Sequence, residues 1–163
     1  MGSFKEIEGN LIDMALDGEF NLIGHGANCF CKMGSGIAKE IAARIPDAVR
    51  TDNETEKGDI KKLGNFTYGN IWNVEEEKRT GEEKLKGYIL NLYTQYNYGT
   101  YSIKVDYEAL TLCMRKINKL YKGYTIGLNK IGAGLAGGNW DKIKKIIQTE
   151  LVDMDVTIVH YKK

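Results

Sequence analysis

Glycine recurs in two stretches of this chain, Met33-Gly34-Ser35-Gly36-Ile37-Ala38 and Ile131-Gly132-Ala133-Gly134-Leu135-Ala136-Gly137-Gly138. Each stretch follows an apolar run typical of a strand and leads into a run with helical spacing. A glycine loop that opens a helix presents unpaired backbone N–H groups and the positive end of the helix dipole, which suit a phosphate. Two such loops predict a ligand with two linked phosphates, held from both sides. The alternative is that the glycines only allow tight turns between strand and helix.

Length and composition bound the class of protein. The length of 163 residues predicts a single domain that spans residues 1–163. The hydrophobic and charged fractions of 42% and 28% are typical of a globular domain. The net charge of +1 argues against a nucleic-acid partner. The chain has no apolar signal region and no apolar stretch of membrane-spanning length, and its three cysteines lack disulfide-framework spacing. We therefore expect a cytoplasmic monomer without a membrane partner.

Apolar periodicity predicts strands that alternate with helices. Strand patterns cover residues 4–8, 20–25, 66–74, 87–93, 124–128 and 156–159, and helical spacing covers 11–16, 36–45, 106–121 and 140–151. Pro46 marks the end of the second helix, residues 52–62 read as a polar connection, and the charged run 75–84 reads as a solvated hairpin loop. This order predicts a three-layer α/β/α sandwich. In such sheets ligands bind at the carboxyl ends of the strands, where both glycine loops would lie.

Other nucleotide and metal motifs fit poorly. Gly132-x-Gly134-x-x-Gly137 matches the dinucleotide-binding fingerprint, but that fingerprint opens the first βαβ unit, and here only 26 residues follow it. Neither loop continues into the Gly-Lys-Ser/Thr of a Walker motif, which disfavours ordinary ATP or GTP hydrolysis. Cys29, Cys31 and the two histidines are too few soft ligands for a zinc site, and no acidic cluster suggests magnesium. We expect neither a metal nor a cofactor.

Three segments resemble the macro domain family in the same order along the chain. Gly24-His25-Gly26-Ala27-Asn28-Cys29, followed by 33–38, resembles that family's first phosphate loop, and residues 131–140 resemble its second. Gly9-Asn10-Leu11 matches the family's first strand-to-helix turn. The resemblance implies an α/β/α sandwich around a mixed, roughly six-stranded sheet, with ADP-ribose or one of its derivatives as a small-molecule ligand.

The resemblance also implies a position for each part of that ligand. Asn10 and Leu11 would lie at the adenine end, where the family more often has an Asp, and an Asn oxygen could still accept the bond from the adenine amino group. Asn28 would face the distal ribose, and the two glycine loops would enclose the diphosphate. The ligand-binding residues implied are Asn10, Leu11, Gly26, Ala27, Asn28, Met33, Gly34, Ser35, Gly36, Ile37, Ala38, Ile131, Gly132, Ala133, Gly134, Leu135, Ala136 and Gly137.

Within the family, the arrangement His25-Gly26-Ala27-Asn28-Cys29 is most similar to the small ADP-ribose-1″-phosphate phosphatases. That subgroup removes the terminal phosphate and leaves ADP-ribose, which implies a metal-independent phosphatase with His25 and Asn28 as its catalytic residues. His25 could take a proton from the attacking water or protonate the leaving oxygen. The alternative for His25 is a buried histidine bonded to a backbone carbonyl.

Two further functions remain open. The chain could be a reader that binds ADP-ribose without hydrolysis, or a hydrolase of O-acetyl-ADP-ribose or protein-linked ADP-ribose, with an ADP-ribosylated protein as its partner. Other macro-domain hydrolases use a Lys–Asp pair whose Asp lies in the second loop, and Ala136 stands at that position here. Residues 93–98, rich in tyrosine, either flank the distal ribose or pack against the sheet edge.

Overall fold

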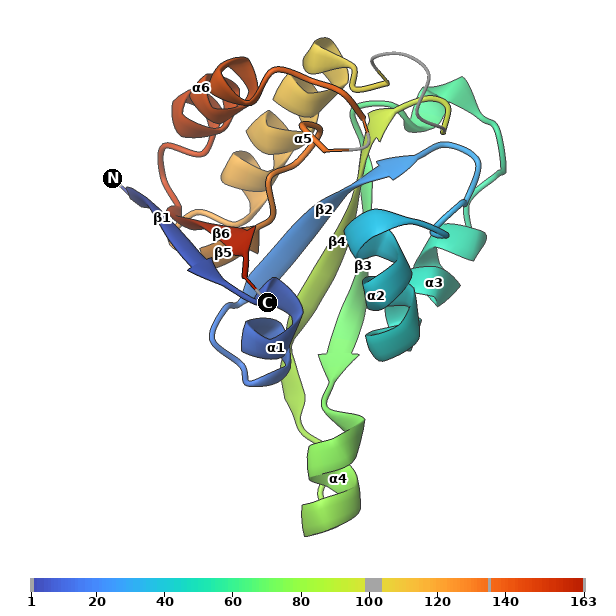
Figure 1. Cartoon of the computed structure of the whole chain (residues 1–163), viewed down its shortest axis with the longest axis vertical. Helices are drawn as coiled ribbons and strands as arrows, with labels where there is room; N and C mark the ends of the chain where they lie inside the picture. The colour runs from blue at the N-terminus through green and yellow to red at the C-terminus, as the bar shows by residue number, and fades with distance from the viewer. Residues whose placement is uncertain (1, 99–103, 135, 163) are drawn as a thin grey trace.

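A mixed six-stranded sheet forms the centre of the computed structural model, which describes residues 2–98, 104–134 and 136–162. The strand order is β1-β6-β5-β2-β4-β3, and β3 alone is antiparallel to its neighbour (Figure 1). The α/β sandwich predicted from the sequence is confirmed. The strands are β1 (Ser3–Gly9), β2 (Leu22–Asn28), β3 (Phe66–Trp72), β4 (Leu85–Gln95), β5 (Thr125–Leu128) and β6 (Asp155–Tyr161).

Helices cover both faces of the sheet (Figure 1). On one face lie α1 (Leu11–Leu16), α2 (Gly36–Arg44) and α3 (Pro46–Asn53), and on the other lie α5 (Tyr107–Leu120) and α6 (Trp140–Glu150). The short α4 (Val74–Thr80) projects from one end of the molecule, and a 3-10 turn spans Ile60–Lys62. Among the described residues, no helix is both long and apolar enough to cross a membrane.

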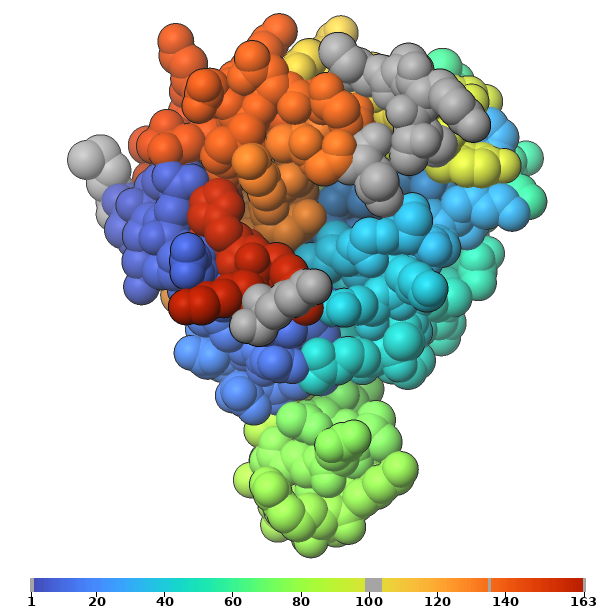
Figure 2. All heavy atoms as spheres, in the orientation of Figure 1, coloured from blue at the N-terminus to red at the C-terminus, as the bar shows by residue number. Residues whose placement is uncertain are grey.

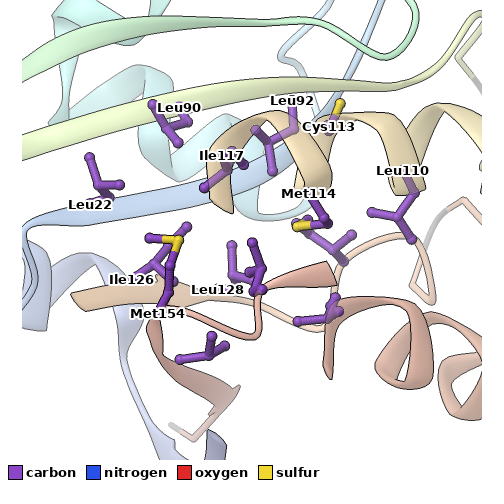
Figure 3. Packing of buried hydrophobic residues seen from close by; sticks show 14 of the residues in the cluster. Leu22, Leu90, Leu92, Leu110, Cys113, Met114, Ile117, Ile126, Leu128 and Met154 are labelled. Atoms are coloured by element: carbon purple, nitrogen blue, oxygen red, sulfur yellow. The ribbon is translucent and has the colours of Figure 1, made fainter. Parts of the chain in front are cut away.

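Alternate residues of the strands supply two separate cores, because successive strand side chains point to opposite faces. Leu22 of β2 packs with Leu90, Leu128 and the buried side of α5 and α6 (Figure 3). Its neighbour Ile23 packs on the opposite face, in the cluster that includes Ile41 of α2. The same alternation sends His25, two residues beyond Ile23, into the layer below α2 and α3.

Two helices were not predicted from the sequence. Pro46 does end α2, but it also opens α3, because proline suits the first helical position where no N–H bond is needed. The run 75–84 was predicted to be a hairpin loop, and this prediction is wrong because residues 74–80 form α4. Asn73 caps this helix by accepting from Glu76 N. Three glutamates in the first turn stabilise the helix further, because their negative charge lies at the positive end of the helix dipole. No residue of α4 is buried, so its charged side chains are solvated as expected.

Parallel strands bring the two glycine loops to one edge of the sheet. β2, β4 and β5 run in the same direction, so their carboxyl ends lie at one edge of the sheet. Residues 33–38 lie on the path from β2 into α2, and residues 129–134 follow β5, so both loops lie at this edge. Figure 2 shows the segment leading into α2 (cyan) and the segment before α6 (orange) on the same face of the molecule. The chain therefore places the two predicted phosphate loops opposite each other.

Candidate ligand-binding cleft

Two connected cavities lie between the glycine loops. The first, which we call the His25 chamber, has a volume of about 550 Å³, and the second, the Asn10 chamber, about 610 Å³. Since both are lined by the same five residues at their junction, they form one cleft that follows the carboxyl edge of the sheet. The shared residues are Gly36, Ile37, Asn129, Lys130 and Gly134.

The first loop leaves backbone donors free at the start of α2. Ser35 is the N-cap residue, but its side chain makes no capping hydrogen bond. Within the described part of the chain, the N–H groups of Gly36, Ile37 and Ala38 have no acceptor. These three residues line the His25 chamber. The loop can therefore donate to an anion, as its sequence predicts.

The second loop is held in shape by its own glycines. Gly132 has φ +72°, its carbonyl accepts from Gly138 N at 2.7 Å, and a Cβ there would come within 2.8 Å of Val105 Cγ2. Among the described residues, the N–H groups of Gly132 and Gly134 meet no acceptor. A Cβ on Gly34 or Gly134 would meet no protein atom within 4 Å. The space beside these two glycines is therefore open to a ligand.

His25 is fully buried and belongs to a polar network beneath the cleft. Its Nε2 lies 2.7 Å from Asn91 Oδ1, while Asn91 Nδ2 donates to Ala48 O and to the hydroxyls of Thr51 and Thr67. Because the Asn91 amide thus presents its oxygen to the ring, Nε2 carries the proton and Nδ1 keeps its lone pair. Burial lowers the pKa of His25 below its ordinary value, although the Asn91 bond opposes the shift. The ring is therefore neutral at pH 7.

Three buried polar atoms lack a hydrogen-bond partner in the described part of the chain: His25 Nδ1, Thr94 Oγ1 and Asn129 Oδ1. They belong to the carboxyl-end region of β2, β4 and β5, and His25 and Asn129 both line the His25 chamber. Buried polar groups are normally paired, with protein, water or a ligand. This edge of the sheet thus has buried polar atoms whose partners do not come from the described residues.

Asn28 shapes the turn that leads to the first loop. Its Oδ1 accepts from Phe30 N at 3.0 Å and Lys32 N at 3.3 Å, and its Nδ2 donates to Lys32 O at 2.8 Å. Cys31, between them, has φ +57°, which is rare for a residue other than glycine. Asn28 lines the His25 chamber, where the distal ribose was expected, while its amide binds the backbone of residues 30–32.

A buried lysine fixes the same turn from behind. Lys62 Nζ donates to Cys29 O at 2.8 Å, to Thr55 Oγ1 at 2.7 Å and to Glu56 O at 3.1 Å. Its ammonium also lies 5.0 Å from the centre of the Tyr93 ring, whose hydroxyl donates to Asp52 Oδ1. Burial raises the pKa of Tyr93. Within residues 93–98, Tyr93 is buried in the protein interior, whereas Gln95 and Tyr98 line the His25 chamber.

At the other end of the cleft, Asn10 caps α1. Its Oδ1 accepts from Asp13 N at 3.0 Å, and Asn10 lines the Asn10 chamber beside Leu11. His160 also lines this chamber, and its Nε2 lies 3.0 Å from Glu6 Oε1. Glu6 accepts from Lys144 as well, and these two bonds lower the pKa of Glu6.

Most of the residues predicted for the site line this cleft. Ala133 lines the Asn10 chamber, Ile131 is fully buried, and neither Ile131 nor Gly137 lines either chamber. Leu135 lies outside the described residues. Sequence reasoning missed Lys32, Glu40, Asn129, Lys130 and Tyr161, and it included Gln95 only as part of the segment 93–98. Of these, Asn129 directly follows β5 and could have been found by the strand-end rule. The predicted residues that line the His25 chamber are Gly26, Ala27, Asn28, Met33, Gly34, Ser35, Gly36, Ile37, Ala38, Gly132, Gly134 and Ala136, together with His25.

Solved structures share this architecture. The macrodomain of Thermus aquaticus DarG superposes with a TM-score of 0.68 at 18% identity, over 100% of both chains. Thermosipho africanus DarTG, solved in complex with ADP-ribose, gives a TM-score of 0.71 at 15% identity, over 98% of this chain and 42% of that one. The fold is therefore that of a macrodomain.

A relative in sequence is also known. The chain is 37% identical to the "Uncharacterized 17.5 kDa protein in tk-vs intergenic region" of Enterobacteria phage T4, over 96% of both chains. The chain belongs to the same family as this phage protein. No family model matches the present chain.

Proposed function

We propose that this chain binds ADP-ribose derivatives in the cleft and removes the terminal phosphate from ADP-ribose-1″-phosphate. The observation that carries the proposal is the junction of the two chambers, where Gly36 and Gly134 from opposite loops line the same space. A diphosphate at this junction would accept from the free N–H groups of both loops. The adenosine would occupy the Asn10 chamber and the distal ribose the His25 chamber. Thermosipho africanus DarTG, of which 42% matches this fold, was solved in complex with ADP-ribose, and this supports the ligand class.

His25 and Asn28 are the residues proposed for the hydrolytic step. The neutral ring, oriented by Asn91, has its Nδ1 lone pair available to accept a proton from the attacking water. The water oxygen forms the new bond to phosphorus, the bond from phosphorus to the 1″ oxygen of the ribose breaks, and the proton taken up by His25 passes to that leaving oxygen. Asn28 fixes the turn beside the distal ribose and so positions the terminal phosphate. Phosphoryl transfer depends on positioning and charge neutralisation more than on covalent chemistry, so a site of this kind suffices without a metal.

A reader without hydrolytic activity is the second candidate. The observation that favours it is the complete burial of the His25 side chain, whose Nε2 is already engaged by Asn91. A reader would bind ADP-ribose through the same loops and leave its derivatives intact.

Phosphate release distinguishes these two candidates. The purified protein is incubated with ADP-ribose-1″-phosphate, and His25→Gln is expected to lower turnover at least about a hundredfold, the range for loss of a general base. Affinity for ADP-ribose, measured by calorimetry, should stay within a few fold. Binding without phosphate release would establish the reader, and a panel with O-acetyl and protein-linked ADP-ribose tests the remaining hydrolase activities. Failure to bind ADP-ribose would overturn both candidates.

A further inference from the structure

The charged side chains that line the His25 chamber have a single sign. Lys32 and Lys130 line it, and among the described residues that do so there is no Asp or Glu. The Asn10 chamber, in contrast, includes Glu40. A chamber with two ammonium groups and no carboxylate favours a ligand that carries negative charge at this end.

The two lysines occupy different positions in the cleft. Lys130 lines both chambers and so lies at their junction, where the diphosphate is placed by the proposed function. Lys32 lines the His25 chamber alone, so it lies beyond the junction, on the side of the terminal group. Its Nζ is 6.0 Å from the centre of the Tyr98 ring, which lines the same chamber.

The backbone of Lys32 is fixed before any ligand binds. The amide of Asn28 bonds both the N–H and the carbonyl of Lys32, and Lys62 holds the carbonyl of Cys29 from behind. The side chain of Lys32, by contrast, is without a carboxylate partner in the described part of the chain. A backbone that is already fixed spares the cost of ordering the main chain of residue 32 when a ligand binds.

We propose that Lys32 is the specificity-determining residue that distinguishes a ligand ending in a phosphate monoester from one ending in a ribose hydroxyl. This inference rests on the proposed function, because it assumes that the terminal group occupies the His25 chamber. A phosphate monoester adds about two negative charges at pH 7, whereas the hydroxyl adds none. The ammonium of Lys32 can meet this charge as a point-charge donor. Asn28 then acts through Lys32 as a positioning residue.

The test compares two ligands in four proteins: the wild type, Lys32→Gln, Lys32→Arg and Lys39→Gln. Lys39 is an exposed lysine of α2 that lines neither chamber, so it controls for the loss of one positive charge. Affinity for ADP-ribose is measured by calorimetry, and KM for ADP-ribose-1″-phosphate by phosphate release. Lys32→Gln should raise that KM by about fivefold or more, as expected for one charge-assisted hydrogen bond, and change the Kd for ADP-ribose less than twofold.

The controls separate charge recognition from a structural effect. Lys32→Arg should keep most of the preference for ADP-ribose-1″-phosphate over ADP-ribose, and Lys39→Gln should behave as the wild type. The preference should also weaken as salt is raised to about 1 M, because salt screens exposed charges. Equal losses for both ligands in Lys32→Gln, or no loss for either, would overturn the role of Lys32.

Failure of the proposed function would look different. If the wild type binds both ligands but releases no phosphate, the phosphatase assignment fails, and the preference is read instead from the two Kd values in the same four proteins. A wild type that binds neither ligand overturns the ligand assignment, and the role of Lys32 with it.

Discussion

A substitution at Gly34 should weaken ligand binding without destabilising the fold. A Cβ at this position would meet no protein atom within 4 Å, and the residue lines the His25 chamber. Gly34→Ala should therefore leave the free energy of unfolding unchanged or raise it by about 0.4–1 kcal/mol, through a less flexible unfolded chain. Affinity for ADP-ribose should fall about tenfold or more, because the methyl group occupies the ligand's space.

Urea denaturation and calorimetry of the Gly34→Ala variant check both parts. Gly134→Ala should behave in the same way, since a Cβ there also meets open space. An unchanged Kd in both variants would contradict the placement of the ligand between the loops.

His25 should make the stability of the protein depend on pH. Burial lowers its folded pKa below the ordinary value of 6.5, so below about pH 6.5 the unfolded state binds more protons than the folded state. The contribution of the neutral ring is complete above pH 6.5 and is lost as the pH falls toward the folded pKa. The free energy of unfolding should therefore drop more steeply between about pH 7.5 and 5 in the wild type than in His25→Gln.

Chemical denaturation at several pH values measures this difference in slope. His160 is present in both proteins and cancels in the comparison. Parallel curves for the two proteins would show that His25 is not buried as a neutral ring.

The turn 29–32 is the element on which the first loop depends, and Lys62 holds it. Lys62→Met removes the bonds from the ammonium to Cys29 O, Cys31 Sγ, Thr55 Oγ1 and Glu56 O, and leaves the two carbonyls without this donor. The expected cost is about 1–3 kcal/mol in the free energy of unfolding, together with weaker binding of ADP-ribose. Lys61→Met, at the adjacent exposed lysine, should change neither property. Equal stability of the two variants in urea would contradict the anchoring role.

Periodic elements could be predicted from the sequence because their apolar faces are buried. The helix ending at Leu120 was predicted from spacing and from Asp106, which does cap it by accepting from Ala109 N. The element α4 could not be predicted in this way because it buries no residue and so has no apolar face to reveal it. Capping by Asn73 and the order of acids and bases were its only signals.

The cleft was partly predictable for a related reason. Glycine loops can be recognised from the local sequence alone. The partner of His25, in contrast, is Asn91 on β4, 66 residues away, and only the pairing of β2 with β4 brings these two residues together. Lys32 likewise has no motif of its own. Its position follows from the amide of Asn28 and from Lys62, a contact across 33 residues to Cys29 that periodicity does not encode.

At the scale of the whole molecule, the two glycine loops belong to opposite layers. The first leads into α2, which packs on one face of the sheet, and the second leads into α6, which packs on the other. A diphosphate bound by both loops would connect the two layers at the edge of the sheet. Binding at 100 times Kd should raise the free energy of unfolding by about 2.7 kcal/mol, which a thermal shift can follow.

A crystal structure of the protein with ADP-ribose tests this central claim most directly. The diphosphate should lie between residues 34–37 and 132–134, within hydrogen-bonding distance of their backbone N–H groups, with the distal ribose in the His25 chamber. A ligand bound away from either loop, or with its ribose in the Asn10 chamber, would contradict the account.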